Sequence, residues 1–258
     1  MKTNNSHLQK KDIQSPAFEP GRIPFLFRQN ALTRITGHTL RPGGLWLTQK
    51  AMEICDFSPT DLVLDAGCGY GMTSRYLLKN HGIRSVGIDA AMHSQCVQPQ
   101  FVQARLPALP FKPATFNGIF CECVLSLIPD KASCLNSFFQ ILKANSRLVL
   151  TDLYIPERFE NYISQQDNLQ TPVSCLEGAV SMLTLIKLIE TAGFHIDMIE
   201  DHTRLLKELA GQMVFEHGSL NHFWEKLSGT VCDSRVSHAC RTGCLKPGYC
   251  MIIAGKYE

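Results

Sequence analysis

The stretch that decides the fold of this chain is VLDAGCGYG, residues 63–71. Two apolar residues lead into Asp65, and glycine then occupies positions 67, 69 and 71. A related acidic ending, VGID, lies at residues 86–89. An apolar run that ends in an acidic residue and a glycine-rich turn is typical of a β-strand that is followed by a ligand-binding loop and then by a helix.

Short apolar or β-branched runs alternate with helix-length segments on both sides of this motif. The runs that predict strands are residues 62–65, 85–89, 101–104, 116–123, 147–154, 195–201 and 248–256. The segments that predict helices are residues 45–57, 71–82 with Gly82 as the C-cap, 130–145 and 179–194. This alternation indicates an α/β fold: a Rossmann-like, mostly parallel sheet of about seven strands with helices on both faces.

Length and composition predict a single domain. The chain has 258 residues, of which 45% are hydrophobic, and this is enough for one full core. Residues 1–21 are polar and aperiodic, so we expect a flexible tail followed by one domain over residues 22–258. Within it we expect an N-terminal cap segment at 22–58, and insertions at 155–177 and 202–247, after strands five and six, that cover the substrate.

The charge balance favours a small-molecule partner. The chain has 25 Lys and Arg residues against 23 Asp and Glu residues, and its basic residues form no dense run. It therefore lacks the clustered positive charge that is typical of nucleic-acid-binding proteins. We find no secretory signal and no apolar stretch of the roughly 20 residues that a membrane span needs. We therefore expect a cytoplasmic protein whose 11 cysteines are reduced. The sequence leaves the oligomeric state open.

The glycine motif and the acids around it indicate a nucleoside cofactor. Gly67 and Gly69 permit close approach of a ligand to the backbone, and Gly71 permits tight packing of the next helix. Asp89 is placed to accept hydrogen bonds from a ribose. Asp65 would repel a pyrophosphate and attract an ammonium group, which disfavours a nicotinamide dehydrogenase and fits S-adenosylmethionine.

With these motifs, the stretch from Leu45 to Tyr154 resembles a class I S-adenosylmethionine-dependent methyltransferase. It is similar to the branch that methylates quinones, sterols and arsenite, through VLDAGCGYG, VGID and the run from Ala104 to Tyr154. The resemblance implies the class I methyltransferase fold and methyl transfer to a small molecule. The cofactor contacts that it implies are Arg41, Asp65, Ala66, Gly67, Cys68, Gly69, Gly71, Thr73, Asp89, Ala90, Arg105, Leu106, Cys121 and Glu122.

The chain departs from the family pattern at three places. Where the family often has an acid for the adenine amino group, this chain has Ala104, Arg105 and Leu106, so adenine is expected to rest on backbone and apolar contacts. The usual aspartate of the next motif is Asn117. The segment LKANS, residues 142–146, replaces a glycine-containing turn that we expect just before strand five.

Methyl transfer is an in-line displacement that needs a protein base only if the acceptor arrives protonated. The candidate catalytic residues are Glu122, Asp152 and Tyr154, at the ends of two predicted strands. Strand alternation would place Cys121 and Cys123 on one side and Glu122 on the other. The alternatives left open are that Glu122 caps the next helix and that Asp152 and Tyr154 have structural roles.

The segment GHTLRPGG, residues 37–44, is expected to close over the cofactor. Arg41 would contact the cofactor carboxylate or an anionic acceptor, or else lie in an exposed turn. Thr48 and Thr73 are further possible cofactor contacts, with helix capping as the alternative.

Two other functions stay open. Cys232, Cys240 and Cys244, with Cys250, could bind a thiophilic metalloid or metal, but their spacing matches no zinc module, and we predict no metal site. The departures from the family pattern also leave open a partner protein that binds S-adenosylmethionine without catalysis.

Overall fold

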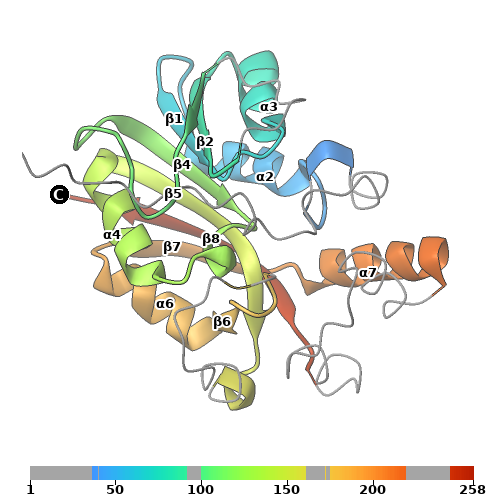
Figure 1. Ribbon diagram of the computed structural model, residues 1–258. Coiled ribbons are helices and arrows are strands. Elements are labelled where there is room, and N and C mark those ends of the chain that lie inside the picture. Colours follow the sequence, from blue (N-terminus) through green and yellow to red (C-terminus); the bar gives the residue numbers. More distant parts are fainter. Residues whose placement is uncertain (1–36, 40, 92–99, 161–171, 173–174, 219–244) are drawn as a thin grey trace, which may run out of the picture.

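The computed structural model of the protein describes residues 37–39, 41–91, 100–160, 172, 175–218 and 245–258. The predicted tail at 1–21 and the cysteines at 232, 240 and 244 lie outside these residues. The described chain folds around one twisted sheet with helices packed against it (Figure 1).

The sheet has eight strands in the order β3-β2-β1-β4-β5-β8-β7, with β6 paired to β5 off this path. The strands are β1 (Leu62–Ala66), β2 (Arg84–Asp89), β3 (Phe101–Gln103), β4 (Phe116–Glu122), β5 (Leu142–Ile155), β6 (Val180–Ser181), β7 (His195–Asp201) and β8 (Gly248–Lys256). Pairing is parallel except where β8 lies antiparallel between β5 and β7. The prediction of a Rossmann-like, mostly parallel sheet is confirmed, and the two-residue β6 is the strand that it missed.

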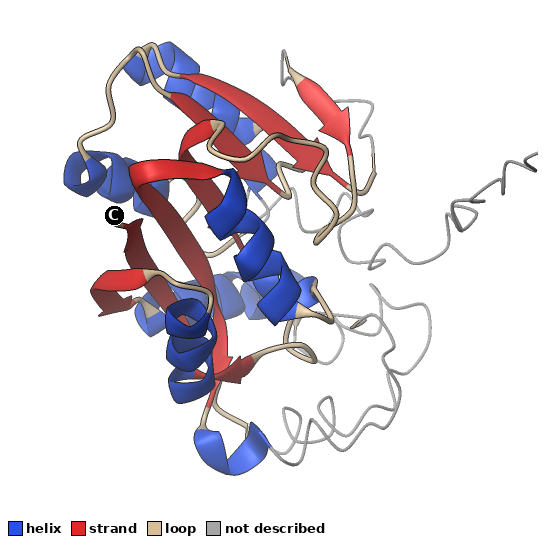
Figure 2. Cartoon of the chain, turned by 90° about the vertical axis from the view of Figure 1, so that its left-hand side faces the viewer, coloured by secondary structure: helices blue, strands red, loops and turns tan. Residues whose placement is uncertain are grey.

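Helices cover both faces of the sheet, as predicted (Figure 2). They are α2 (Trp46–Cys55), α3 (Met72–His81), α4 (Lys131–Ile141), α6 (Met182–Thr191) and α7 (Thr203–His217), with short 3-10 turns η3 (Gly37–Thr39), η4 (Leu125–Leu127) and η5 (Glu157–Phe159). Gly82 caps α3 in the left-handed conformation, with φ 69° and its N–H directed to the carbonyls of Leu77 and Leu78. The predicted C-cap is therefore confirmed.

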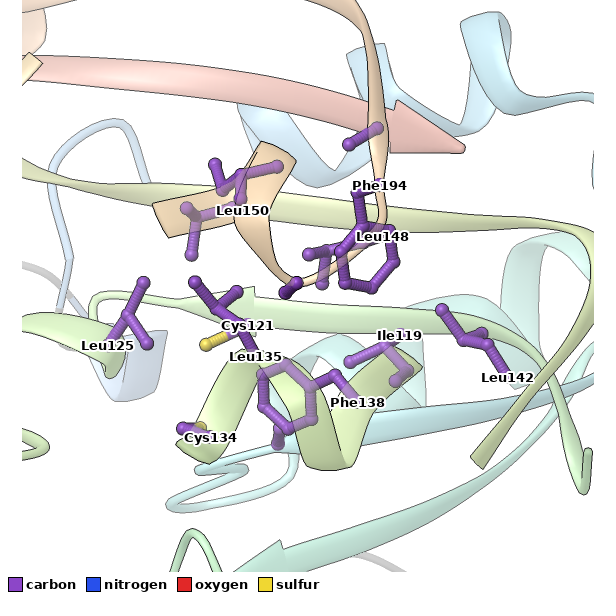
Figure 3. Close-up of a cluster of buried hydrophobic side chains, with 14 of the residues drawn as sticks. Ile119, Cys121, Leu125, Cys134, Leu135, Phe138, Leu142, Leu148, Leu150 and Phe194 are labelled. Carbon is purple, nitrogen blue, oxygen red and sulfur yellow. The ribbon is translucent and has the colours of Figure 1, made fainter. Parts of the chain in front are cut away.

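Strand alternation divides the core into two clusters. Ile119 and Cys121 of β4 and Leu148 of β5 face α4 and α6, where Phe138 of α4 is fully buried among them (Figure 3). The residues between them, such as Phe120, face α2 and α3. Because nearly all of the central strands are buried on both faces, their sequences read as continuous apolar runs.

The prediction that a helix continues to residue 145 is wrong. Asp130 caps α4 by accepting a hydrogen bond from the Ser133 N–H at 2.9 Å, but the helix ends at Ile141. Leu142 pairs with Phe116, so LKANS belongs to the start of β5 instead of a turn before it. The register shifts there, and Asn145 takes up the irregularity with φ 57°. Burial of Leu142 against β4 outweighs the helical propensity of the segment.

The predicted insertion at 202–247 begins with α7, which extends from the edge of the sheet (Figure 1). Leu205 and Leu206 pack against the second core cluster, whereas Phe215 near the far end is 91% exposed. None of the helices in the described ranges has both the length and the apolar character that a membrane crossing requires.

Candidate functional site

A cavity of about 340 Å³ lies at the carboxyl ends of β1, β2 and β4. β1 pairs with β2 on one side and β4 on the other, so the chain reverses its direction of progress across the sheet at this point. Loops diverge at such a point and leave a crevice. We call this space the switch-point cavity. Its wall comes from the glycine loop (residues 67–71, of which 67–70 line the cavity), the segments after β2, β3 and β4, and η3 of the N-terminal segment.

The glycine loop is held under the cavity by the neighbouring strand. The N–H groups of Gly67 and Cys68 both donate to the Ile88 carbonyl, at 2.8 and 2.9 Å. Gly69 has φ 51°, and a Cβ there would meet nothing within 4 Å among the described residues, so its backbone is open to a ligand. A Cβ on Gly67 would overlap the Val124 side chain. Gly67 thus makes room for Val124, a packing role that the prediction of ligand approach did not include.

Asp89 joins the end of β2 to the glycine loop. Its Oδ2 accepts from the Gly69 N–H at 2.9 Å, and its Oδ1 accepts from the Ala91 N–H at 3.0 Å. Asp89 and Ala90 both line the cavity. An ionised carboxylate has about four lone-pair sites, so each oxygen retains capacity for a hydroxyl donor.

Asp65 is a buried carboxylate in the wall of the same cavity, only 5% exposed. Its Oδ2 accepts from the Ser74 N–H at 3.1 Å and from the Ser74 hydroxyl at 2.7 Å. Within the described residues both hydrogen bonds end on Oδ2, which leaves Oδ1 for another donor. Burial raises the pKa of Asp65 to about 6; Glu122 adds to this effect, whereas Ser74 and Arg41 oppose it. This acid therefore lacks a full counter-charge.

Glu122 at the end of β4 is bound into a buried network. Its Oε2 lies 3.0 Å from Arg41 Nη2 and accepts from the Thr73 hydroxyl at 2.6 Å, and its Oε1 accepts from the Thr48 hydroxyl at 2.8 Å. Arg41 also donates to both threonine hydroxyls and to the Gly44 carbonyl. Two readings from the sequence are thus wrong: Glu122 does not cap the next helix, and Arg41, 7% exposed, does not lie in an exposed turn.

This network fixes the N-terminal segment to the core. Arg41 and Thr48 come from that segment and from α2, Thr73 from α3, and Glu122 from β4. Arg41, Thr73 and Glu122 line the cavity, whereas the fully buried Thr48 lies behind it. The network therefore shapes one wall of the cavity.

The other two catalytic candidates lie outside the cavity lining. Asp152 is 2% exposed and accepts from the Ser126 N–H and hydroxyl at 2.8 and 2.7 Å, which anchors η4. Burial raises its pKa. The Tyr154 hydroxyl donates to Asp201 Oδ2 at 3.1 Å. These contacts favour the structural alternative for both residues.

Strand β4 ends one residue earlier than predicted, and this changes where its cysteines point. Cys121 is fully buried in the cluster under α4 (Figure 3), whereas Cys123 has φ 58° and belongs to the cluster on the opposite face. The prediction that they share a side is wrong, because Cys123 is no longer extended. Cys123 lines the cavity and donates to the Tyr249 hydroxyl at 3.3 Å. Three predicted cofactor contacts have no place in the described lining: Ala66, which is 1% exposed, Gly71 and Cys121.

Some of the other lining residues were predicted from the sequence as cofactor contacts, and some were not. Arg105 and Leu106, with Ala104, line the cavity after β3, where an adenine contact was expected. His38 of η3 and Tyr70 of the glycine loop also line it, with ring centroids 5.0 Å apart. Both were quoted within their motifs but not selected, since the sequence gives no sign that two segments so far apart meet. The segment after β4, from Val124 to Asp130, was missed for the same reason.

The described residues contain no group of three or more His, Cys, Asp or Glu side chains that could hold a metal ion. Of the C-terminal cysteines, only Cys250 is within them. It is fully buried in β8, its Sγ donates to the Asp152 carbonyl at 3.5 Å, and burial raises the pKa of its thiol to about 12. Cys250 is therefore a packed thiol in this fold.

Comparison with known proteins agrees with this geometry. Residues 64–150 match the family model of a methyltransferase domain. A phosphoethanolamine N-methyltransferase of Triticum aestivum is 27% identical over 187 residues, which cover 66% of this chain and 35% of that protein. The O-methyltransferase rstn1 of Aspergillus nomiae is 27% identical over 105 residues, 36% of this chain and 47% of that protein. The chain thus spans only about a third to a half of these relatives' length.

Solved structures share the fold at lower identity. Phosphoethanolamine N-methyltransferase 2 of Haemonchus contortus, in complex with phosphomonomethylethanolamine and S-adenosylhomocysteine, has a TM-score of 0.65 and 18% identity, covering 91% of this chain and 60% of that chain. The [4+2]-cyclase SpnF has a TM-score of 0.58 and 17% identity over 82% of this chain and 80% of that chain. Strand order, glycine motif and the match of residues 64–150 to a methyltransferase domain agree, and the described chain has the Rossmann-like class I methyltransferase fold.

Proposed function

We propose that the protein transfers a methyl group from S-adenosylmethionine to a small-molecule acceptor and that the switch-point cavity holds the cofactor. The observation that carries this proposal is the pair Asp65 and Asp89 on one cavity, the first buried without a full counter-charge and the second with capacity for hydroxyl donors. A ligand with an ammonium group and a ribose satisfies both. S-adenosylmethionine has these two groups and no phosphate.

Each part of the cofactor has a counterpart in the wall. Asp89 would accept from the ribose hydroxyls, Asp65 would accept from the ammonium group, and the open backbone of Gly69 would permit close approach. The segment from Ala104 to Leu106, whose side chains offer no carboxylate, would hold the adenine. Arg41 has only its Nε and Nη2 bonded within the described residues, so its Nη1 remains for the cofactor carboxylate.

When bound, the cofactor supplies a methyl group on a positively charged sulfur. The chain's contribution is to orient the acceptor in line with that bond and to keep water away. The network of Glu122, Arg41 and Thr73 gives the wall a fixed geometry. Because the Glu122 carboxylate already holds two hydrogen bonds, from Thr48 and Thr73, and an ion pair with Arg41, we assign it to positioning Arg41 instead of to proton transfer.

The acceptor in this proposal is a small molecule, not a nucleic acid. A net charge of +2 without a basic run supports this choice, since a nucleic-acid acceptor calls for a cationic surface. The names of the relatives point to amine and hydroxyl acceptors, which makes phosphoethanolamine and simple phenols the first compounds to test. Thiols and arsenite complete the panel, because the metalloid alternative rests on cysteines outside the described residues.

The test is calorimetric titration with S-adenosylmethionine, followed by detection of S-adenosylhomocysteine with each acceptor. Asp89→Ala removes charge-assisted hydrogen bonds of about 1.5–3 kcal/mol, so binding weakens roughly 10- to 100-fold. Asp61→Ala is the matched control, since Asp61 also accepts a backbone N–H, from Ser58, but lies outside the cavity lining. Its affinity stays at the wild-type value.

Two results would contradict the proposal. If the wild type gives no binding heat with or without the acceptors, the cavity does not hold this cofactor. If it binds tightly and no acceptor in the panel yields S-adenosylhomocysteine, the non-catalytic binding protein becomes the better reading. Reduced nicotinamide dinucleotide serves as a negative ligand and should not raise the melting temperature.

A further inference from the structure

Most ionisable side chains of the switch-point cavity already have partners. The Glu122 carboxylate forms an ion pair with Arg41 and accepts hydrogen bonds from Thr73 and Thr48. Asp65 and Asp89 accept from the chain and, in the proposed function, from the cofactor. None of these carboxylates is free to take a proton from an acceptor molecule.

Three other ionisable side chains of the lining, those of Cys123, Asp130 and Arg105, are also poorly suited to accept a proton from the acceptor molecule. Burial raises the pKa of the Cys123 thiol well above its ordinary value, and its Sγ donates to the Tyr249 hydroxyl. The Asp130 carboxylate accepts from the Ser133 N–H at the start of α4, and this hydrogen bond lowers its pKa, which makes it a weaker base. Arg105, a cation, has donors only and cannot accept a proton. The former candidates Asp152 and Tyr154 lie outside the lining.

His38 is the one histidine among the described lining residues. It belongs to η3, which packs against the start of α3, and its ring lies edge-on to Tyr70 at 5.0 Å between centroids with an interplanar angle of 66°. Tyr70 follows Gly69 in the glycine loop, so His38 lies on the glycine-loop side of the cavity. Its side chain is exposed, and imidazole is the side chain suited to proton transfer near neutral pH.

We propose that His38 is the catalytic residue that accepts the proton of the methyl acceptor, an inference that rests on the proposed methyl transfer. The acceptor atom X uses its lone pair to form the X–C bond, and the C–S bond breaks with its electron pair on sulfur. The X–H proton moves to an imidazole nitrogen of His38, the X–H electrons stay on X, and water then takes the proton from the imidazolium. The acceptor is therefore one that arrives protonated: an amine, a phenol or a thiol.

The chain provides a matched control. His81 at the end of α3 also contacts a tyrosine, with its Nε2 3.3 Å from the Tyr76 hydroxyl and the ring centroids 5.3 Å apart, but it is outside the cavity lining. His38→Gln and His81→Gln remove the same group from similar aromatic contacts. The control variant should behave as the wild type in every assay.

The first measurement is NMR of the ring signals in protein labelled with ¹³C-histidine, assigned with the two variants. The ligands are S-adenosylhomocysteine and sinefungin, which has an amine where the cofactor has its methylsulfonium. The His38 signals should shift several-fold more with sinefungin than with S-adenosylhomocysteine. A nuclear Overhauser contact should join a His38 ring proton to the proton on the amine-bearing carbon of sinefungin. The His81 signals should move with neither ligand.

The second measurement is turnover with the acceptor found in the panel. His38→Gln should lower kcat by roughly 10²- to 10⁴-fold at neutral pH, because general-base catalysis has that range, and the loss should shrink at high pH. Affinity for S-adenosylmethionine should stay within about twofold of wild type, since the proposed contacts to the ribose, ammonium, carboxylate and adenine groups are made by other residues.

The outcomes separate this inference from the proposed function. If neither ligand binds, methyl transfer fails and this inference fails with it. If both bind and the His38 signals respond equally to the two ligands, only the role of His38 is overturned. A wild-type kcat in His38→Gln at neutral pH would overturn it as well.

Discussion

Asp65→Asn should stabilise the free protein at neutral pH while it weakens cofactor binding. The side chain keeps its shape, and the amide oxygen can still accept from Ser74 in place of Oδ2. What disappears is a negative charge that is 5% exposed and lacks a full counter-charge. A substitution that raises the stability of the free protein and lowers its affinity for the cofactor would show that the Asp65 charge serves binding at a cost in stability.

The magnitude follows from the pKa of Asp65, which burial raises from 3.8 to about 6. The folded state binds the proton more tightly than the unfolded state, so stability is fully present below pH 3.8 and falls as the pH rises through about 6. At 1.36 kcal/mol per pH unit the complete loss is about 3 kcal/mol, of which about 2 kcal/mol develops between pH 4.5 and pH 8. The Asp65→Asn variant should show no such loss of unfolding free energy with rising pH, because asparagine does not ionise.

The assay is urea unfolding of the wild type and Asp65→Asn at pH 4.5 and pH 8, with Asp61→Asn as control. The difference in unfolding free energy between Asp65→Asn and the wild type should grow by about 2 kcal/mol toward pH 8, equivalent to roughly 4–8 °C in melting temperature. Comparing two pH values cancels any constant cost of the substitution.

Binding of S-adenosylmethionine at pH 8 should weaken roughly 10- to 100-fold in Asp65→Asn, because a charge-assisted hydrogen bond of about 1.5–3 kcal/mol is lost. A stability difference that does not change with pH would refute the inference that Asp65 is a buried, poorly compensated charge. Unchanged affinity would refute its role toward the ammonium group.

Three further substitutions test the walls of the cavity. Arg41→Met should cost about 3–5 kcal/mol in unfolding free energy because it leaves Glu122 buried without its counter-charge, and adding Glu122→Gln should restore part of this; equal stability of Arg41→Met and wild type in urea would contradict the network's role. Gly67→Ala should destabilise the protein by about 1–3 kcal/mol through overlap with Val124 and its φ of 75°, and Val124→Ala should rescue part of it in thermal melts; no rescue would mean that the positive φ alone matters. Asp152→Ala should lower both the melting temperature and the affinity for S-adenosylmethionine, because it releases η4; lowered stability with full affinity would show that η4 does not shape the cavity.

Local sequence patterns were enough to predict most of the sheet. Strand β1 and the turn after it follow from an apolar run, an acid and glycines at 67, 69 and 71, all within one short stretch. The end of α3 follows from Gly82, whose φ of 69° suits glycine. The end of α4 did not follow, because burial of Leu142 against Phe116 depends on a pairing that no local pattern contains.

The residues of the candidate site also fall into those that local sequence patterns predicted and those that only tertiary contacts placed there. The positions of Asp65, Asp89 and the glycines at the cavity follow from the sequence alone, because the carboxyl ends of adjacent parallel strands meet at one edge of the sheet. The partners of Glu122 and the contact between His38 and Tyr70 were decided only by tertiary structure. These contacts join residues far apart in the chain, and they form only when the N-terminal segment packs on α3 and β4, a step driven by burial of its apolar side chains rather than by any motif.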